Sequence, residues 1–187
     1  MPAWHCRLRA KHMLSLSQWP IAQRHKLLGI FTDIDDTLTT DGAITPDALQ
    51  ALAQLQAAGL TVIAITGRPV GWCEAFAGVW PVNAVVAENG AVAWVHNGAL
   101  NEISLQPPSN IPATLSKLYQ QDAATRASNR LRMQAVGERV MREVPGVGLT
   151  QDSAGRETDL AFDYNEFVNV PPDTVQRVLD IVVQEGM

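Results

Sequence analysis

Short apolar runs alternate with helix-like segments through the first half of the chain. The runs at 27–31, 60–65 and 82–87 have the length of buried strands, and polar residues follow each of them. Between these runs, 46–58 carries leucines at helical spacing and 70–78 has the length of a shorter helix. This alternation predicts an α/β fold, a Rossmann-like parallel sheet with helices on both faces.

The pattern changes after residue 90. Asn97-Gly98 lies between two short apolar stretches, at 91–95 and 99–103, and therefore predicts a β-hairpin. Prolines then mark a boundary near residue 107. The remaining sequence predicts a small α+β module. Its expected elements are helices at 113–125 and 129–143, a strand at 158–164 and a last helix that begins near Pro171-Pro172-Asp173.

Charge divides the chain unevenly. Residues 1–26 contain five basic residues and no acid, whereas the rest of the chain holds nine basic and nineteen acidic residues. We interpret 1–26 as a basic N-terminal arm, 27–106 as the N-terminal part of a core domain and 107–187 as the α+β module. Because the body of the protein is acidic, nucleic acid is not expected to be its main partner.

The composition is that of a globular protein in water. The 187 residues are 47% hydrophobic and 18% charged, and no stretch approaches the ~20 continuous apolar residues of a membrane helix. Only two cysteines occur, Cys6 and Cys73, and neither belongs to a recognisable pair or metal motif. The sequence therefore predicts a cytoplasmic protein without a disulfide framework or a membrane partner.

Polar residues gather after the first three apolar runs. Asp33–Asp36, Thr66–Arg68 and Glu88–Gly90 each follow one of these predicted strands. Right-handed crossovers bring the carboxyl ends of parallel strands to one edge of the sheet, where ligands bind in this architecture. We therefore expect the three clusters to converge on one site.

The first cluster has the chemistry of a metal-assisted reaction. In extended chain, the carboxylates of Asp33 and Asp35 point the same way and repel each other, so a cation such as Mg²⁺ is their expected partner. One carboxylate can then attack an electrophile while the other handles protons, and the Thr66 hydroxyl can donate to a phosphoryl oxygen. Acids after strands are also ordinary loop residues, and an Asp-x-Asp motif occurs in metal-dependent glycosyltransferases.

Three stretches together indicate a family. GIFTDIDDTLTTDG, followed by TVIAITGRP and AVVAENGAVAW, resembles the haloacid dehalogenase (HAD) superfamily, which consists mostly of phosphatases. The ENG after the third strand resembles its Cof-type, class IIB branch, which includes sugar-phosphate phosphatases. The matching motifs lie in residues 28–95. The resemblance implies a HAD-like core, and the α+β module then takes the place of a cap domain that closes over the pocket.

The resemblance also implies a role for each site residue. Asp33 is expected to be the nucleophile that forms an aspartyl-phosphate, and Asp35 the general acid and then the base. Mg²⁺ is expected to bind the Asp33 carboxylate and the Asp35 backbone carbonyl. Thr66 is expected to hold the phosphoryl group. Gly67, Arg68 and Asn89 are expected to shape the pocket around a small phosphorylated metabolite, such as a sugar phosphate.

Two elements of the family pattern do not occur in this sequence. A GDxxxD motif is absent, and Lys117, the only lysine after position 26, is expected in the first helix of the cap. The sequence therefore predicts either an incomplete HAD phosphatase chain or a catalytically impaired relative that binds phosphosugars or proteins. It also predicts an open sheet edge, which invites pairing with another chain such as a second copy in a homodimer.

Overall fold

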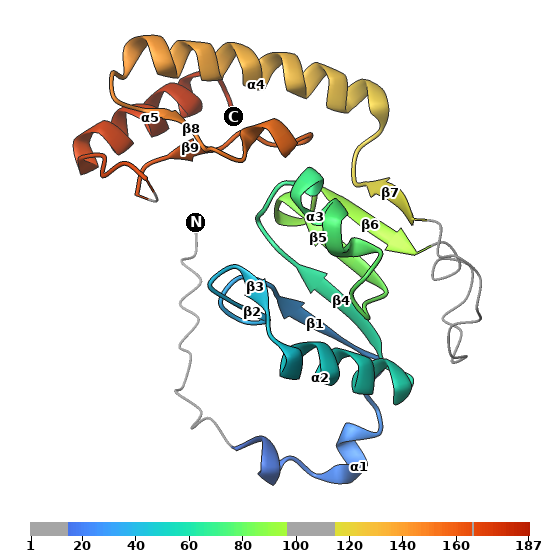
Figure 1. The fold of residues 1–187 in the computed structure, drawn as a ribbon. Coiled ribbons are helices and arrows are strands. Elements are labelled where there is room, and N and C mark those ends of the chain that lie inside the picture. The colour runs from blue at the N-terminus through green and yellow to red at the C-terminus, as the bar shows by residue number, and fades with distance from the viewer. Residues whose placement is uncertain (1–14, 97–114, 166) are drawn as a thin grey trace, which may run out of the picture.

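The computed structural model describes residues 15–96, 115–165 and 167–187, and its largest element is a five-stranded sheet (Figure 1). In spatial order the strands are β1 (Gly29–Asp33), β4 (Thr61–Ile65), β5 (Ala84–Ala87), β6 (Val92–His96) and β7 (Leu115–Tyr119). The first three pair in parallel, and β6 and β7 add antiparallel pairings. The expected α/β core is confirmed, with a mixed sheet in which β1 is an edge strand of the part that the structure describes.

Local sequence explains the helices of the core. Thr45 accepts a hydrogen bond from the Ala48 amide (3.4 Å) and Pro46 occupies the first turn, so α2 (Pro46–Ala57) begins where the sequence predicts. The second core helix, α3, spans Val70–Ala77. Two short elements, η1 (Leu16–Gln18) and α1 (Ile21–Arg24), precede the sheet. A short hairpin of two-residue strands, β2 (Thr39–Thr40) and β3 (Ala43–Ile44), follows β1.

One hydrophobic cluster joins both helices to one face of the sheet. Leu52 of α2 and Cys73 of α3 are buried in the same cluster as Val62 and Ala64 of β4. The register places Phe31 and Leu118 on the opposite face, where they are 70% and 52% exposed. Among the described residues, helices therefore cover one face of the sheet rather than both, contrary to the sequence-based expectation. Successive right-handed connections through the order β1-β4-β5 place α2 and α3 on the same side. The other face keeps large apolar side chains at its surface.

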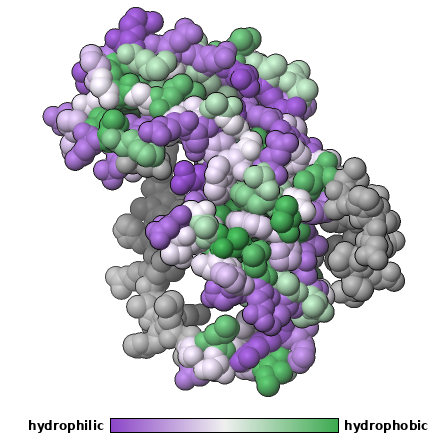
Figure 2. Space-filling view, viewed as in Figure 1, coloured by the Kyte–Doolittle hydropathy of each residue, from purple (hydrophilic) through white to green (hydrophobic). Residues whose placement is uncertain are grey.

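The C-terminal half forms a second, smaller module. Figure 1 shows it beyond α3, on the side away from α1. A compact cluster of Val136, Val140, Val144 and Ile181 packs its two helices together, and hydrophilic side chains cover much of the outer surface over the longer helix (Figure 2). The elements of this module are α4 (Ala123–Glu143), β8 (Gly148–Leu149), η3 (Ser153–Gly155), β9 (Phe162–Asp163) and α5 (Pro172–Gln184).

The structure differs from the sequence-based expectation at the entry to this module. The helix expected at 113–125 is wrong, because Leu115–Tyr119 pairs along its whole length with β6 and extends the core sheet. Asp122 then caps α4 by accepting a hydrogen bond from the Thr125 amide (2.9 Å). Tertiary pairing with an existing strand outweighs local helix propensity here. We therefore place the proposed division between core and cap after Tyr119.

Other expectations for this half have mixed outcomes. The helix at 129–143 and the last helix are confirmed by α4 and α5. The strand expected at 158–164 is reduced to the two residues of β9, which pair with β8. The Asn97-Gly98 turn and the strand at 99–103 lie outside the described residues. None of the described helices is both long and apolar enough to cross a membrane.

Candidate active site between the core sheet and the cap

The two predicted catalytic carboxylates lie at the carboxyl end of β1: Asp33 is its last residue, and Asp35 follows in the loop. The carbonyl of Ile34 accepts hydrogen bonds from three following amides, which folds the chain back at once after the strand. Asp36 completes this turn in the left-handed region, at φ 54°. The Thr37 hydroxyl donates to Asp33 Oδ2 (3.4 Å) and so supports the exposed Asp33 side chain. Asp33 and Asp35 thus lie at the carboxyl edge of the sheet, as predicted.

The end of β4 adds the second cluster to the same edge. Asp33 pairs in register with Ile65, so Thr66 follows directly beside the β1 loop. The buried Thr66 hydroxyl donates to Asp35 Oδ2 (3.3 Å) and accepts from the Arg68 amide (3.0 Å). Arg68 in turn reaches Asp35 Oδ1 with its Nε (3.4 Å). The structure therefore brings Asp35, Thr66 and Arg68 into direct contact.

The third cluster packs against the second. Glu88 and Asn89 both have positive φ, 49° and 56°, which turns the chain sharply after β5. This turn sets the Asn89 side chain against Gly67: a Cβ on Gly67 would lie 3.1 Å from Asn89 Oδ1. A side chain at position 67 would crowd Asn89. All the site residues expected from the sequence thus gather at the carboxyl edge of three neighbouring strands.

Glu88 has a structural role that the sequence did not reveal. Its side chain is 2% exposed, and its carboxylate accepts hydrogen bonds from the amides of Val70 (3.0 Å), Glu157 (3.0 Å) and Thr158 (2.6 Å), and from the Thr158 hydroxyl. Val70 belongs to α3, whereas Glu157 and Thr158 belong to the cap. One buried carboxylate therefore ties the cap to the core. In the sequence, the one indication of this role was that Glu88 is an acid placed directly after a predicted buried strand.

A cavity of about 240 Å³ lies where the two modules meet. Asp35, Gly67 and Arg68 line it from the core, and Thr150, Asp152 and Arg156 line it from the cap. The cap approaches closely beside this cavity, because Gly155 of η3 lies against Gly71 of α3: a Cβ on Gly71 would be 3.0 Å from Gly155 Cα.

Ion pairs organise the cap side of the cavity. Arg156 Nη1 donates to both carboxylate oxygens of Asp159 (2.9 Å each), and its Nη2 donates to Asp152 Oδ2 (3.4 Å). Burial disfavours the charge of Asp152, but the Thr150 hydroxyl and Arg156 outweigh it, so the pKa of Asp152 lies below its ordinary value. For Asp159, burial prevails over the Arg156 interaction and raises the pKa.

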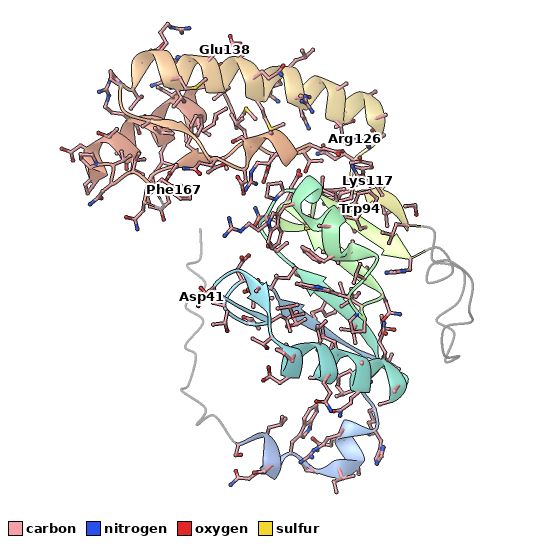
Figure 3. The ribbon with its side chains drawn as sticks, in the orientation of Figure 1. Asp41, Trp94, Lys117, Arg126, Glu138 and Phe167 are labelled. Carbon is pink, nitrogen blue, oxygen red and sulfur yellow. The ribbon has the colours of Figure 1, made fainter. Side chains whose placement is uncertain are left out.

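Lys117 lies in β7 rather than in a helix and is already engaged. Its Nζ donates to Glu157 Oε1 (2.5 Å) and lies 4.7 Å from the centroid of the Trp94 ring. Figure 3 shows Lys117 and Trp94 together, with Arg126 close by where the chain enters α4. Burial opposes the charge of Glu157, but its hydrogen bonds from Lys117 and Tyr119 lower the pKa overall. Lys117 thus joins the sheet to the cap.

The acidic side chains present fit a small magnesium ligand set. Within the ranges that the structure describes, no three His, Cys, Asp or Glu side chains form a metal-binding group. Mg²⁺ often binds through only one or two protein carboxylates and completes its octahedron with water and substrate phosphate. The Asp33 carboxylate at the end of β1 and the Asp35 backbone carbonyl two residues on match this smaller requirement.

Comparison with known proteins shows the family. A family model of haloacid dehalogenase-like hydrolases matches residues 30–136, more than half of the chain. The chain therefore belongs to the haloacid dehalogenase-like hydrolases, an enzyme lineage, as the motifs after the first three strands predict. The match begins in β1 and continues through β7 into α4. No curated protein matches the chain.

Solved structures share the fold at low sequence identity. A Thermoplasma acidophilum protein matches with a TM-score of 0.56 at 18% identity, over 86% of this chain and 59% of its own. The ATP-bound IMP-nucleotidase of Plasmodium falciparum gives 0.50 at 12% identity, over 86% of this chain and 42% of its own. A HAD phosphatase of Bacteroides thetaiotaomicron gives 0.44 at 16%, over 90% and 51%. The chain spans less than two thirds of each of these structures.

Proposed function

We propose that the protein is a Mg²⁺-dependent phosphatase that hydrolyses a small phosphorylated metabolite through an aspartyl-phosphate. The observation that supports this most is the convergence of Asp33, Asp35 and Thr66 at one sheet edge, where Asp35 also lines a cavity between core and cap. Two neighbouring carboxylates are costly to hold together without a cation or a proton to share. A site that only binds a ligand has no need of such a pair.

In the proposed reaction, Asp33 attacks phosphorus while the bond from phosphorus to the leaving oxygen breaks. Asp35 gives its proton to that oxygen, and the Thr66 hydroxyl donates to a phosphoryl oxygen. Water then attacks the aspartyl-phosphate and passes a proton to Asp35, which releases phosphate and restores Asp33. Mg²⁺, held by the Asp33 carboxylate and the Asp35 carbonyl, would neutralise phosphoryl charge.

Two arginines supply further positive charge near the reacting group. Arg68 and Arg156 line the same cavity as Asp35, and Arg68 Nε contacts that carboxylate. A phosphoryl group in the cavity would compete for the Arg68 guanidinium, whose planar donors suit phosphate oxygens. This exchange would free the Asp35 carboxyl to contact the leaving oxygen. The arginines would thus take over part of the charge neutralisation, since Lys117 is engaged with Glu157.

The volume of the cavity favours a small substrate, and the composition of the chain favours a cytoplasmic location. About 240 Å³ is below the range typical of drug-sized ligands, so a compact sugar phosphate suits it better than a nucleotide. Cys73 is a free, buried thiol, in keeping with a reducing compartment. The acidic net charge of −5 makes nucleic acid an unfavourable partner.

Turnover of p-nitrophenyl phosphate with and without Mg²⁺ tests the proposal. We expect Mg²⁺-dependent hydrolysis that Asp33→Asn lowers by at least about a thousandfold, because the nucleophile is lost. Asp36→Asn is the matched control, because it makes the same replacement of a carboxylate by an amide at a neighbouring residue. Asn tolerates the positive φ of this position. Equal rates for Asp33→Asn and wild type would contradict the proposal, and absence of turnover by wild type would favour the phosphosugar-binding or protein-interaction alternative.

The exposed edge of the sheet supports a proposal about assembly. β1 is an edge strand of the described sheet, and its Phe31 is 70% exposed. We propose that two copies pair through antiparallel β1 strands. A register centred on Phe31 sets Asp33 opposite Gly29 of the other copy, so no two carboxylates face each other. Phe31→Lys should convert a dimer to a monomer in sedimentation, while Val79→Lys, at another exposed apolar position, should not. A monomeric wild type at about 100 μM would refute pairing.

A further inference from the structure

A second cavity, the junction cavity, lies where the chain passes from the core into the cap and has a volume of about 330 Å³. Gln120 and Gln121, between β7 and α4, line it at this connection. Ala91 lines it from the core, where its carbonyl accepts from the Gln120 amide (3.0 Å). Thr158, whose amide donates to Glu88, lines it from the cap. A molecule in this cavity would therefore contact both modules close to the buried carboxylate that joins them.

The charge of the junction cavity differs from that of the cavity beside Asp35. Two aspartates balance two arginines in the lining of the cavity beside Asp35. The lining of the junction cavity contains Arg126 and Arg132, from the first half of α4, and no acidic side chain among the described residues. Residues 27–187 carry nine basic and nineteen acidic residues, so a wall with positive charge alone is unusual in this protein. Such a wall favours an anionic ligand.

Backbone carbonyls and an aromatic ring, rather than carboxylates, hold these two arginines in place. Arg126 Nη1 donates to the Gln121 carbonyl (2.6 Å), and the guanidinium lies 3.7 Å from the centroid of the Tyr119 ring, where the chain enters α4 (Figure 3). Arg132 Nη2 donates to two carbonyls just beyond α5 (3.3 Å each). Neither arginine forms an ion pair with a carboxylate of the described residues, whereas three other arginines of the cap do.

The acid nearest in its effect, Glu157, is already compensated. Burial opposes the charge of Glu157, whereas Lys117, Tyr119 and, least of the three, Arg126 lower its pKa. Its two carboxylate oxygens accept from Lys117 Nζ and the Tyr119 hydroxyl (2.5 Å each). A guanidinium has five N–H donors, and within the described part of the chain Arg126 and Arg132 each use those of one nitrogen. Both arginines therefore keep charge and donors for a ligand.

We propose that the junction cavity binds a compact organic anion with two acidic groups, and that such a ligand holds the cap against the core. Two guanidiniums offer separate places for two acidic groups, and their planar donors suit both carboxylate and phosphate oxygens. The side-chain amides of Gln120, Gln121 and Asn129 also line the cavity and can bond the uncharged part of the ligand. A volume of about 330 Å³ lies in the lower range of small-molecule pockets and exceeds what one inorganic anion fills.

Isothermal titration calorimetry in metal-free buffer tests this binding independently of catalysis. The probes are malonate, a dicarboxylate, and phosphonoacetate, which carries one carboxylate and one phosphonate and has no ester bond to hydrolyse. We expect one or both to bind at least about tenfold more tightly than acetate and methylphosphonate, which carry a single acidic group. The tighter probe identifies the second acidic group as carboxylate or phosphate. No binding of either probe at about 10 mM would overturn the inference.

Substitutions on α4 assign the anion to the junction cavity. Arg126→Gln and Arg132→Gln should each weaken binding about tenfold, because each removes one charged set of donors. Arg130→Gln is the matched control, since Arg130 is an exposed arginine of the same helix outside the lining. Arg68→Gln changes the cavity beside Asp35 and should leave the affinity unchanged. Loss of binding in Arg68→Gln, with full binding in both α4 variants, would overturn the inference.

Hydrogen exchange locates the ligand without any substitution. The tighter probe at saturation should slow exchange in 120–133 and at Thr158, because it contacts both the junction and the cap, and should leave 66–68 unchanged. Slower exchange confined to 66–68 would overturn the inference. The inference does not rest on the proposed reaction: binding without turnover of p-nitrophenyl phosphate would support the junction cavity and reject the reaction, and turnover without binding would do the opposite.

Discussion

The core and the cap are held together internally by different forces. Eleven buried hydrophobic residues form the cluster between the core sheet and its helices, whereas the described cap cluster contains four. The cap instead has many charged contacts, such as those of Arg139 with Glu143 and Glu185. Burial of apolar area stabilises strongly, whereas exposed ion pairs contribute little. The core therefore holds the larger hydrophobic cluster, and the cap depends more on polar contacts, including those that join it to the core.

This difference has a functional consequence. The proposed catalytic carboxylates lie on the rigid sheet, whose strands fix their positions. Asp152 and Arg156, which line the cavity beside Asp35, lie on the less strongly packed cap. A cap joined to the core mainly by polar contacts can open for substrate and close over it without disturbing the nucleophile. The predictions below test this contrast, from the largest expected effect to the smallest.

Loss of the buried carboxylate that joins the modules should have the largest effect on stability. Glu88→Ala leaves the amides of Val70, Glu157 and Thr158 without their acceptor, and we expect the free energy of unfolding to fall by about 3–5 kcal/mol in urea denaturation. Glu138→Ala, at an exposed position of α4 (Figure 3), should change it by less than about 0.5 kcal/mol. Equal effects would show that Glu88 does not anchor the cap.

Truncation within the small cap cluster should have the next largest effect. Ile181 is 6% exposed, and Ile181→Ala should lower the free energy of unfolding by about 2–4 kcal/mol. Hydrogen exchange should then accelerate in α4 and α5 while the amides of β4 stay protected. Val183→Ala, 71% exposed on the same helix, is the control. If protection in β4 fell equally, core and cap would unfold as one cooperative unit.

A methyl group at the closest backbone approach should loosen the cap. In Gly71→Ala the new Cβ would lie 3.0 Å from Gly155 Cα and 3.1 Å from its carbonyl oxygen, so the backbone must shift. We expect a loss of about 1–3 kcal/mol in thermal unfolding and a lower affinity for sugar phosphates. Gly148→Ala meets no atom within 4 Å and is the control. An unchanged melting temperature for Gly71→Ala would argue against a tight contact.

The loss of stability at alkaline pH should come from the core, through Cys73. Burial, with a smaller contribution from Glu88, raises the pKa of the Cys73 thiol from 9.0 to about 12. The unfolded chain therefore loses this proton first, and the free energy of unfolding should decrease as the pH rises from about 9 towards 12. Cys73→Ala should reduce this slope. An unchanged slope in that variant would exclude Cys73 as its source.

The loss of stability at acid pH should come mainly from the cap, beside a contribution from Asp47 of the core, whose pKa the Thr45 hydroxyl lowers. The pKa values of Asp152 and Glu157 are lowered despite their partial burial, by Thr150 and Arg156 for Asp152 and by Lys117 and Tyr119 for Glu157. Their contributions are present above the ordinary values of 3.8 and 4.5 and disappear as the pH falls below them, while the raised pKa of Asp159 opposes this trend. Hydrogen exchange at decreasing pH should therefore show α4 losing protection before β4. The reverse order would contradict this assignment.

Sequence reasoning was most successful in the core because its signals are local. Apolar runs, the Thr45 cap and the Asp33–Thr66 spacing each constrain a few neighbouring residues, and the right-handed connection rule then brings the strand ends together. The helix expected at 113–125 was wrong because pairing of Leu115–Tyr119 with β6 is a contact between segments that periodicity cannot reveal. Asp152 and Arg156 gave little signal, since their positions depend on how the cap meets the core.

By itself the sequence determined the family, the α/β core, and the gathering of Asp33, Asp35, Thr66 and Asn89 at one edge, because residues next to strand ends inherit the geometry of the sheet. Only the tertiary structure decided that Glu88 anchors the cap and that Lys117 pairs with Glu157. It also decided that Asp152 and Arg156 line the cavity beside Asp35. These arrangements join residues between 40 and 121 positions apart, and burial in a shared interface, rather than local preference, selects such pairs.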